Sequence, residues 1–77
     1  MSDVTKELMD LAARTFNVSA ESLHAEDDFF TVLNIESIQA LELLSELEMH
    51  FNVEIPDYEL QGVVTFSGLA SLIEKRI

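Results

Sequence analysis

The stretch FFTVLNIESIQALELLSELEMHF, residues 29–51, decides the fold of this 77-residue chain. From about residue 36 onward its apolar residues recur at intervals of three and four, which is the pattern of an amphipathic helix. We expect a helix that begins at Glu36 or Ser37 and ends at Phe51, with a length of about 22 Å. The expected inner stripe consists of Ile38, Leu41, Leu44, Glu48 and Phe51, widened by Leu43 and Leu47.

Ser37 stands at the expected start of this helix, between Glu36 and Ile38. Serine is favoured at the N-terminal cap of a helix, where its hydroxyl accepts a hydrogen bond from a backbone N–H. The junction between a loop and a helix also leaves a hydroxyl accessible from outside. Taken by itself, the residue is therefore either a structural cap or a functional hydroxyl.

The segment before this helix contains one further helix and a long connection. A helix is expected over residues 3–16, capped by Ser2 or Asp3 and ended by Asn17. Periodicity is lost between residues 18 and 34, where we expect irregular chain with a short turn at residues 19–23. The apolar residues that should hold this connection against the core are Leu23, Phe29, Phe30 and Leu33.

The segment after the central helix contains two further helical patterns. Pro56 suits the first turn of a short helix that ends near Gly62, and Ile55 before it must be extended. A last helix is expected at about residues 67–76, capped by Thr65, with Leu69, Leu72 and Ile73 facing inward. The expected fold is all-α: a single domain, residues 1–77, in which three main helices and one short helix form an irregular four-helix bundle with a long first loop.

Composition excludes several functions. The net charge is −11, from 15 acidic and 4 basic residues, which disfavours nucleic acid and anionic membranes and favours partners with basic docking surfaces. No apolar run approaches the roughly 18 residues of a membrane span, and the acidic start does not resemble a signal peptide. We therefore expect a cytoplasmic protein that acts as a monomer and engages neither nucleic acid nor membrane.

Motifs for catalysis or metal binding are missing. The chain has no cysteine, and its two histidines, His24 and His50, have no neighbouring ligand pattern. The acidic segment at residues 24–29 lacks the alternating oxygen ligands and central glycine of a calcium loop. No nucleophile motif of the G-x-S-x-G type is present. We expect no metal site and no enzymatic activity.

An ordered set of residues around Ser37 resembles the acyl carrier protein family. The set corresponds to the L-G-x-D-S-L signature of that family, to the helix that follows it with its exit, and to the cap of the last helix. Its members are Leu33, Glu36, Ser37, Ile38, Leu41, Glu42, Leu47, Phe51, Ile55, Pro56, Asp57 and Thr65. The resemblance implies that Ser37 carries 4′-phosphopantetheine through a phosphodiester. It implies further that a phosphopantetheinyl transferase installs this group from coenzyme A, and that acyl groups are carried as thioesters on its terminal thiol. A helix N-terminus suits such an attachment, since its unpaired N–H groups stabilise an anion.

Several residues depart from the pattern of the family. Glu36 replaces the usual aspartate, Asn34 replaces the usual glycine, and Val32, Gln39 and Met49 stand where acidic residues are common. We interpret these changes as the mark of a specialised carrier with fewer acidic docking residues. The resemblance implies acyl-loading and acyl-processing enzymes with basic docking surfaces as partners. The residues expected to contact partners are Glu36, Ile38, Gln39, Glu42, Glu48 and Met49.

Two leucines suggest an altered acyl pocket. Leu60 and Leu69 occupy positions where the fatty-acid carriers of the family often have alanine, so we expect a shallow pocket and a short or polar cargo. The pocket candidates are Leu43, Leu47, Ile55, Leu60, Val63 and Leu69. The expected pathway is specialised polyketide, lipid or fatty-acid synthesis. Two alternatives remain open, an aminoacyl or peptidyl carrier and an unmodified acidic helical module in which Ser37 is only a cap.

Overall fold

The computed structural model describes residues 3–77, so that Ser2, one of the two expected caps, lies outside the described residues. Within this range the chain forms no β-strand, and only an isolated bridge joins Asp28 to Thr65. The all-helical prediction is confirmed. The elements, in chain order, are α1 (Asp3–Phe16), η1 (Ala20–Ser22), α2 (Phe29–Leu33), α3 (Ser37–Phe51), η2 (Asp57–Leu60) and α4 (Phe66–Glu74).

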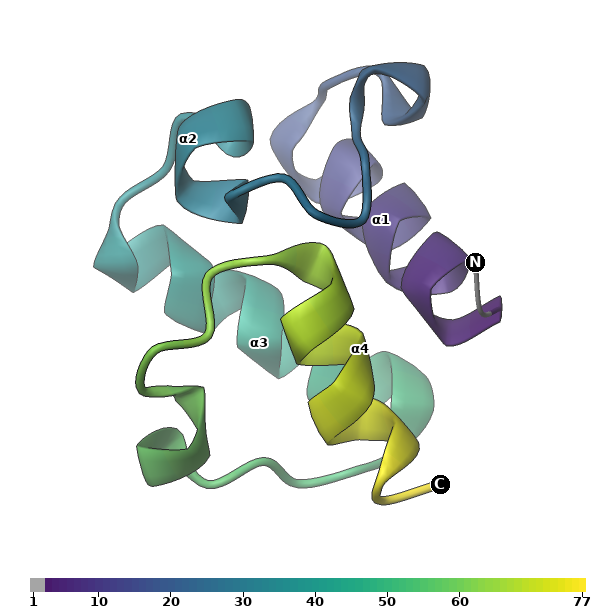
Figure 1. The fold of residues 1–77 in the computed structure, drawn as a ribbon, viewed down its shortest axis with the longest axis vertical. Helices are drawn as coiled ribbons and strands as arrows, with labels where there is room; N and C mark the ends of the chain where they lie inside the picture. The colour runs from purple at the N-terminus through teal and green to yellow at the C-terminus, as the bar shows by residue number, and fades with distance from the viewer. Residues whose placement is uncertain (1–2) are drawn as a thin grey trace.

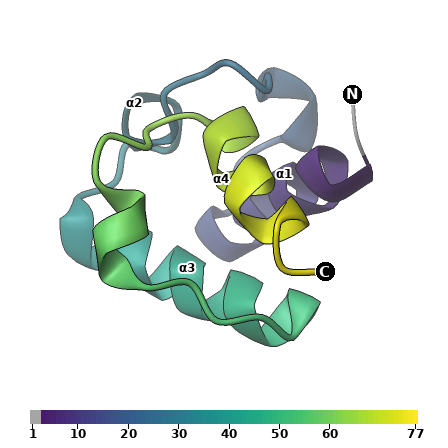
Figure 2. The ribbon, with the colours of Figure 1, turned by 60° about the horizontal axis from the view of Figure 1, so that its bottom comes forward.

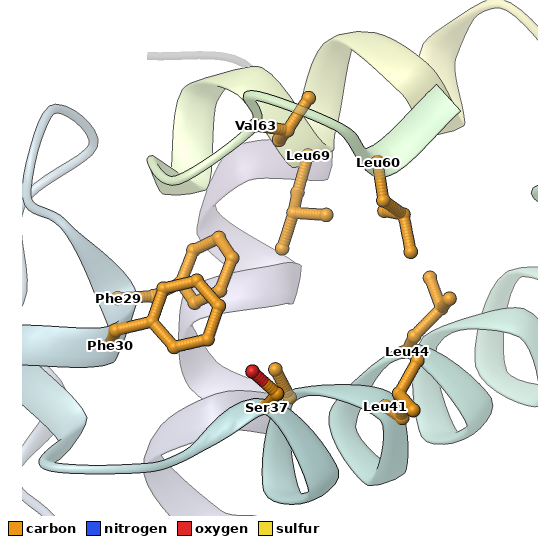
Figure 3. A pocket seen from close by; sticks show the side chains of 9 residues that line it. Phe29, Phe30, Ser37, Leu41, Leu44, Leu60, Val63 and Leu69 are labelled. Atoms are coloured by element: carbon orange, nitrogen blue, oxygen red, sulfur yellow. The ribbon is translucent and has the colours of Figure 1, made fainter. Parts of the chain in front are cut away.

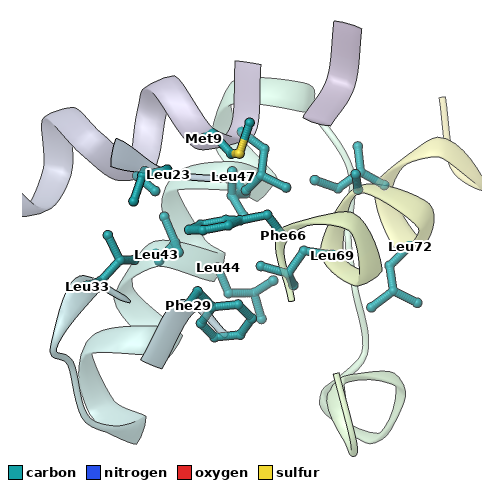
Figure 4. Packing of buried hydrophobic residues seen from close by; sticks show 14 of the residues in the cluster. Met9, Leu23, Phe29, Leu33, Leu43, Leu44, Leu47, Phe66, Leu69 and Leu72 are labelled. Carbon is teal, nitrogen blue, oxygen red and sulfur yellow. The ribbon is translucent and has the colours of Figure 1, made fainter. Parts of the chain in front are cut away.

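The three longer helices enclose the core. α1 packs against both α4 and α3, while η1 and α2 lie along the connection that leads from α1 to α3 (Figures 1 and 2). Leu8, Leu47, Phe66 and Ile73 are completely buried where these helices meet, and further leucines surround them (Figure 4). Since buried apolar area is the main favourable term in folding, this packing of distant segments holds the small domain together.

The inner face of α3 differs from the stripe that the sequence predicts. Leu43, Leu44 and Leu47 are buried, whereas Ile38 is 72% exposed and Leu41 is 50% exposed. Apolar residues occur on several sides of this helix, so intervals of three and four describe more than one stripe. Packing against α1 and α4 selects the stripe with Leu43 and Leu47 at its centre. The expected inward position of Ile38 and Leu41 is therefore wrong.

Three asparagines end the first three α-helices. Asn17, Asn34 and Asn52 follow α1, α2 and α3, and each has a backbone φ of 56° in the left-handed region. After each one, the next N–H bonds back to a carbonyl near the end of the helix, at distances of 2.9 to 3.0 Å. Asparagine adopts this conformation more readily than most residues, which explains why it serves at positions that often carry glycine. The predicted end of the first helix at Asn17 is confirmed.

The first connection is more regular than expected. It contains the short turn expected at residues 19–23, which is η1, and also α2, which the pattern of apolar residues did not predict. The side chain of Asp28 caps α2 by accepting hydrogen bonds from the N–H groups of Phe30 and Thr31, at 2.9 and 3.2 Å. Phe29 and Leu33 are buried as predicted, and the ring of Phe29 lies 6.0 Å from that of Phe66.

The second connection contains η2, a single 3₁₀ turn in place of the expected helix at residues 56–62. Pro56 precedes this turn as its cap. α4 then begins after Thr65, whose hydroxyl accepts a hydrogen bond from the N–H of Gly68 at 3.1 Å, so this predicted cap is confirmed. The helix ends at Glu74, two residues earlier than expected, and Arg76 reaches back to form an ion pair with Glu59.

Hydrogen bonds join the first connection to the start of α4. The N–H of Phe29 bonds to the carbonyl of Val64 at 2.9 Å, and the N–H of Ser67 bonds to the carbonyl of Ala25 at the same distance. The hydroxyl of Ser67 also donates to the carboxylate of Glu26 at 2.6 Å. These bonds hold α2 and the N-terminus of α4 side by side.

Candidate functional site

The loop that leads into α3 is fixed at each of its residues. Asn34 ends α2, and the side chain of Ile35 is 8% exposed and therefore anchors the loop in the core. Glu36 is extended, with φ −103° and ψ 175°, and is the N-cap of the helix. Its N–H bonds to Oε1 of Gln39 at 2.9 Å, and its carbonyl accepts the N–H of Ala40 at 3.0 Å. The helix therefore begins at Ser37, directly after its cap.

Ser37 is the first helical residue rather than the cap. The interpretation of Ser37 as the capping residue is wrong, because Glu36 occupies that position and Gln39 satisfies its N–H. The side chain of Ser37 is exposed, and its hydroxyl makes no hydrogen bond within residues 3–77. The hydroxyl is thus accessible and free from any structural role in the described part of the chain.

A cavity of about 220 Å³ opens beside this hydroxyl. α2, the first half of α3, the η2 turn, the loop after it and α4 each contribute to its wall, and Figure 3 shows Ser37 at its edge. The lining residues are Phe29, Phe30, Ser37, Ala40, Leu41, Leu44, Leu60, Val63 and Leu69. Apart from Ser37, every one of these side chains is apolar. For comparison, an apolar cavity of about 150 Å³ is large enough to hold benzene.

The predicted pocket residues fall into two groups. Leu60, Val63 and Leu69 line this cavity. Leu43 and Leu47 are buried on the part of α3 that faces the core, and Ile55 is buried in the connection that follows it, so none of the three lines the cavity. The residues not anticipated are Phe29, Phe30, Ala40, Leu41 and Leu44. The sequence spacing could have indicated Ala40, Leu41 and Leu44, because positions 40, 41 and 44 share a helix face with position 37.

Leu60 and Leu69 leave an open space beside α3, and the expected shallow pocket stays a prediction. Both side chains form part of the cavity wall, yet about 220 Å³ remains between them and α3. Leu60 is only partly buried, since it belongs to a short 3₁₀ turn that approaches the core from outside. Leucine at position 60, which is larger than the alanine common in the family, therefore forms part of the cavity wall without closing the cavity.

The expected partner-binding residues lie mostly on the outer face of α3. Glu36, Gln39 and Glu42 are exposed, and Ile38 and Met49 are 72% and 71% exposed. This face therefore carries apolar side chains among carboxylates. Glu48 differs from the others, because it is partly buried and its Oε2 accepts the N–H of Ile55 at 2.8 Å. Its carboxylate helps to fix the connection after α3.

Two other kinds of site are absent from the described residues. No group of three or more histidines and carboxylates in residues 3–77 is arranged to hold a metal ion. The helices formed by the same residues are all too short or too polar to cross a lipid bilayer.

Comparisons with known proteins agree with this geometry. Residues 6–73 match the sequence model of the family described as "Phosphopantetheine attachment site". The chain is 34% identical over 77 residues to a protein of Porphyromonas gingivalis named acyl carrier protein, covering 100% of this chain and 99% of the relative. Proteins with the same name from Wolinella succinogenes and Lactobacillus acidophilus are each 31% identical, over 88% and 94% of this chain and 90% of each relative. The chain therefore belongs to the acyl carrier protein family, whose members are phosphopantetheine-bearing carriers rather than enzymes.

Proposed function

We propose that Ser37 is the residue to which 4′-phosphopantetheine is attached, and that residues 1–77 act as one carrier domain for acyl intermediates held as thioesters. The observation that supports this assignment best is the position of the Ser37 hydroxyl. It is exposed, it makes no hydrogen bond to any residue in 3–77, and it lies at the edge of an apolar cavity of about 220 Å³. An attachment site needs the first two properties, and an acyl carrier benefits from the third.

The surroundings of Ser37 fit a phosphodiester. As the first residue of α3, Ser37 lies where backbone N–H groups of the first turn have no partner within the helix and where the helix dipole is positive. Both features stabilise the negative charge of a phosphodiester. When bound, the prosthetic group supplies the thiol for thioester formation, which the chain lacks because it has no cysteine.

The cavity favours an apolar cargo. Each methylene that leaves water for an apolar environment contributes about 0.8 kcal/mol, so an acyl chain gains stability by entering this space. The wall offers a single polar side chain, Ser37, which leaves a polar or aminoacyl group without hydrogen-bond partners. The sequence led us to expect a short or polar cargo. We favour acyl groups with an apolar end, of polyketide, lipid or fatty-acid type, over a polar cargo and over an aminoacyl or peptidyl carrier.

The exposed face of α3 is the proposed docking surface for the transferase and for the acyl-loading and acyl-processing enzymes. Its carboxylates suit partners with basic residues, while Ile38, Leu41 and Met49 suit an apolar area at the centre of the contact. Contacts between exposed charges weaken as salt is added, so binding should be weak and reversible, as a shuttling carrier requires. We place this carrier in the cytoplasm as a monomer.

Mass spectrometry tests the attachment. The intact protein is incubated with coenzyme A and a phosphopantetheinyl transferase of broad specificity, and a gain of one phosphopantetheine is expected. Ser37→Ala should abolish this gain, whereas Ser45→Ala, which changes another exposed serine of α3, should retain it. If wild-type protein stayed unmodified while a known carrier in the same tube reacted, an acidic interaction module would become the better account.

A further inference from the structure

The side chain of Gln39 takes part in the start of α3. Its Oε1 accepts a hydrogen bond from the N–H of Glu36 at 2.9 Å, although Gln39 itself is an exposed residue with no part in the core. Glutamine at the third helical position commonly reaches back to the cap in this way. Here the bond fixes Glu36 as the cap, with Ser37 inside the helix.

The sequence permits a competing start for the same helix. Serine is a much better N-cap than most residues, and Ser37 directly follows Glu36. If the helix began one residue later, Ser37 would become the cap and its hydroxyl would accept a hydrogen bond from a first-turn N–H. The bond between Ala40 and the carbonyl of Glu36, 3.0 Å long, would then be broken. The two starts differ in whether the Ser37 hydroxyl is free.

The rest of the loop does not decide between these two starts. Asn34 is fixed by its left-handed conformation at the end of α2, and Ile35 by burial and by the bond from its N–H to the carbonyl of Phe30 at 3.0 Å. Both residues precede either start, so their positions are compatible with each. The hydrogen bond from the Glu36 N–H to the side chain of Gln39 favours one of the two starts, because it exists only when Glu36 is the cap.

We propose that Gln39 is a positioning residue for Ser37: it selects the helix start in which the serine hydroxyl is free to react with a phosphopantetheinyl donor. This inference rests on the proposed attachment at Ser37. It assigns to Gln39 a task within the carrier itself, apart from any contact that it makes with a partner enzyme.

The test compares two changes at Gln39 in the modification reaction, with kcat and KM measured separately for the unmodified carrier. Gln39→Asn keeps a neutral amide but is one methylene too short to reach the Glu36 N–H, so kcat should fall about fivefold, as expected for the loss of one capping interaction. Gln39→Glu keeps an acceptor of the right length and should retain most of the rate. The fall in kcat is the readout of positioning, because the loss of a partner contact made by Gln39 would appear in KM.

A control separates positioning from general stability. Thr65→Val removes the side-chain cap of α4 without changing the start of α3, so it lowers stability by a similar mechanism and should leave kcat per folded molecule unaltered. Circular dichroism confirms that each variant is folded. An unchanged kcat for Gln39→Asn, or a loss that appears in KM alone, would overturn the positioning role while the attachment at Ser37 stands. Unmodified wild-type protein would overturn both proposals.

Discussion

Truncation of Leu60 tests whether the cavity receives the acyl chain. Leu60 is partly buried and forms one wall of the cavity. Leu60→Ala removes three carbon groups, and full burial of each contributes about 0.8 kcal/mol, so the incomplete burial of Leu60 leaves an expected loss of about 1–2 kcal/mol. For a domain of this size, each kcal/mol corresponds to about 4–8 °C in melting temperature. The unacylated variant should therefore melt about 4–16 °C below the wild type.

The same change should enlarge the space available to an acyl chain. An octanoyl chain on the prosthetic group can occupy the volume that the leucine leaves, and its methylenes then replace the apolar packing that truncation removes. Octanoyl loading should therefore raise the melting temperature of Leu60→Ala by more than it raises that of the wild type. Acetyl loading should raise neither by much, since an acetyl group is too short to enter far.

Differential scanning calorimetry of unloaded, acetyl-loaded and octanoyl-loaded protein measures these effects. Leu72→Ala is the matched control, because Leu72 is 8% exposed, belongs to the same core and does not line the cavity. That variant should lose stability without any added response to octanoyl loading. An equal octanoyl response in the wild type and in both variants would refute the assignment of the cavity to the acyl chain.

Two further predictions concern the residues that frame α3. Glu48→Ala removes the partly buried acceptor of the Ile55 N–H and should lower the free energy of unfolding by about 1–2 kcal/mol in urea denaturation, whereas Glu46→Ala, at an exposed position, should change it little. Asn34→Ala should lower the free energy of unfolding by about 1 kcal/mol, because alanine is strained at a φ of 56°. Asn34→Gly should leave it nearly unchanged, because glycine adopts this conformation readily. A larger loss for glycine than for alanine would contradict the role of the left-handed backbone at Asn34.

The helices that the sequence predicted well are those with several turns. α1 and α3 have 14 and 15 residues, so their spacing of apolar residues repeats often enough to be recognised. α2 has five residues, and its stability comes from the Asp28 cap and from the burial of Phe29 and Leu33. Since packing against the rest of the fold creates this helix, periodicity within its own sequence could not reveal it.

The candidate site shows the same division between local and distant information. Ser37 could be found from the sequence, because the order and spacing of the residues around it lie within one continuous stretch. The cavity could not, since its wall combines residues from separate segments whose approach depends on packing. The sequence also favoured Ser37 as a cap, because the propensity of serine is a local property, whereas the bond from Glu36 to Gln39 depends on the geometry of the turn.

The hydrogen bonds between the first connection and the start of α4 have a consequence for local unfolding. α2 is too short to persist alone, and its Phe29 N–H and the neighbouring Ala25 carbonyl are both bonded to the segment that begins α4. If the first connection with α2 moved away from the start of α4, both of these hydrogen bonds would break. We therefore expect the two segments to open together as one cooperative unit. They form neighbouring parts of the cavity wall (Figure 3), so a guest that displaces one of them would also have to displace the other.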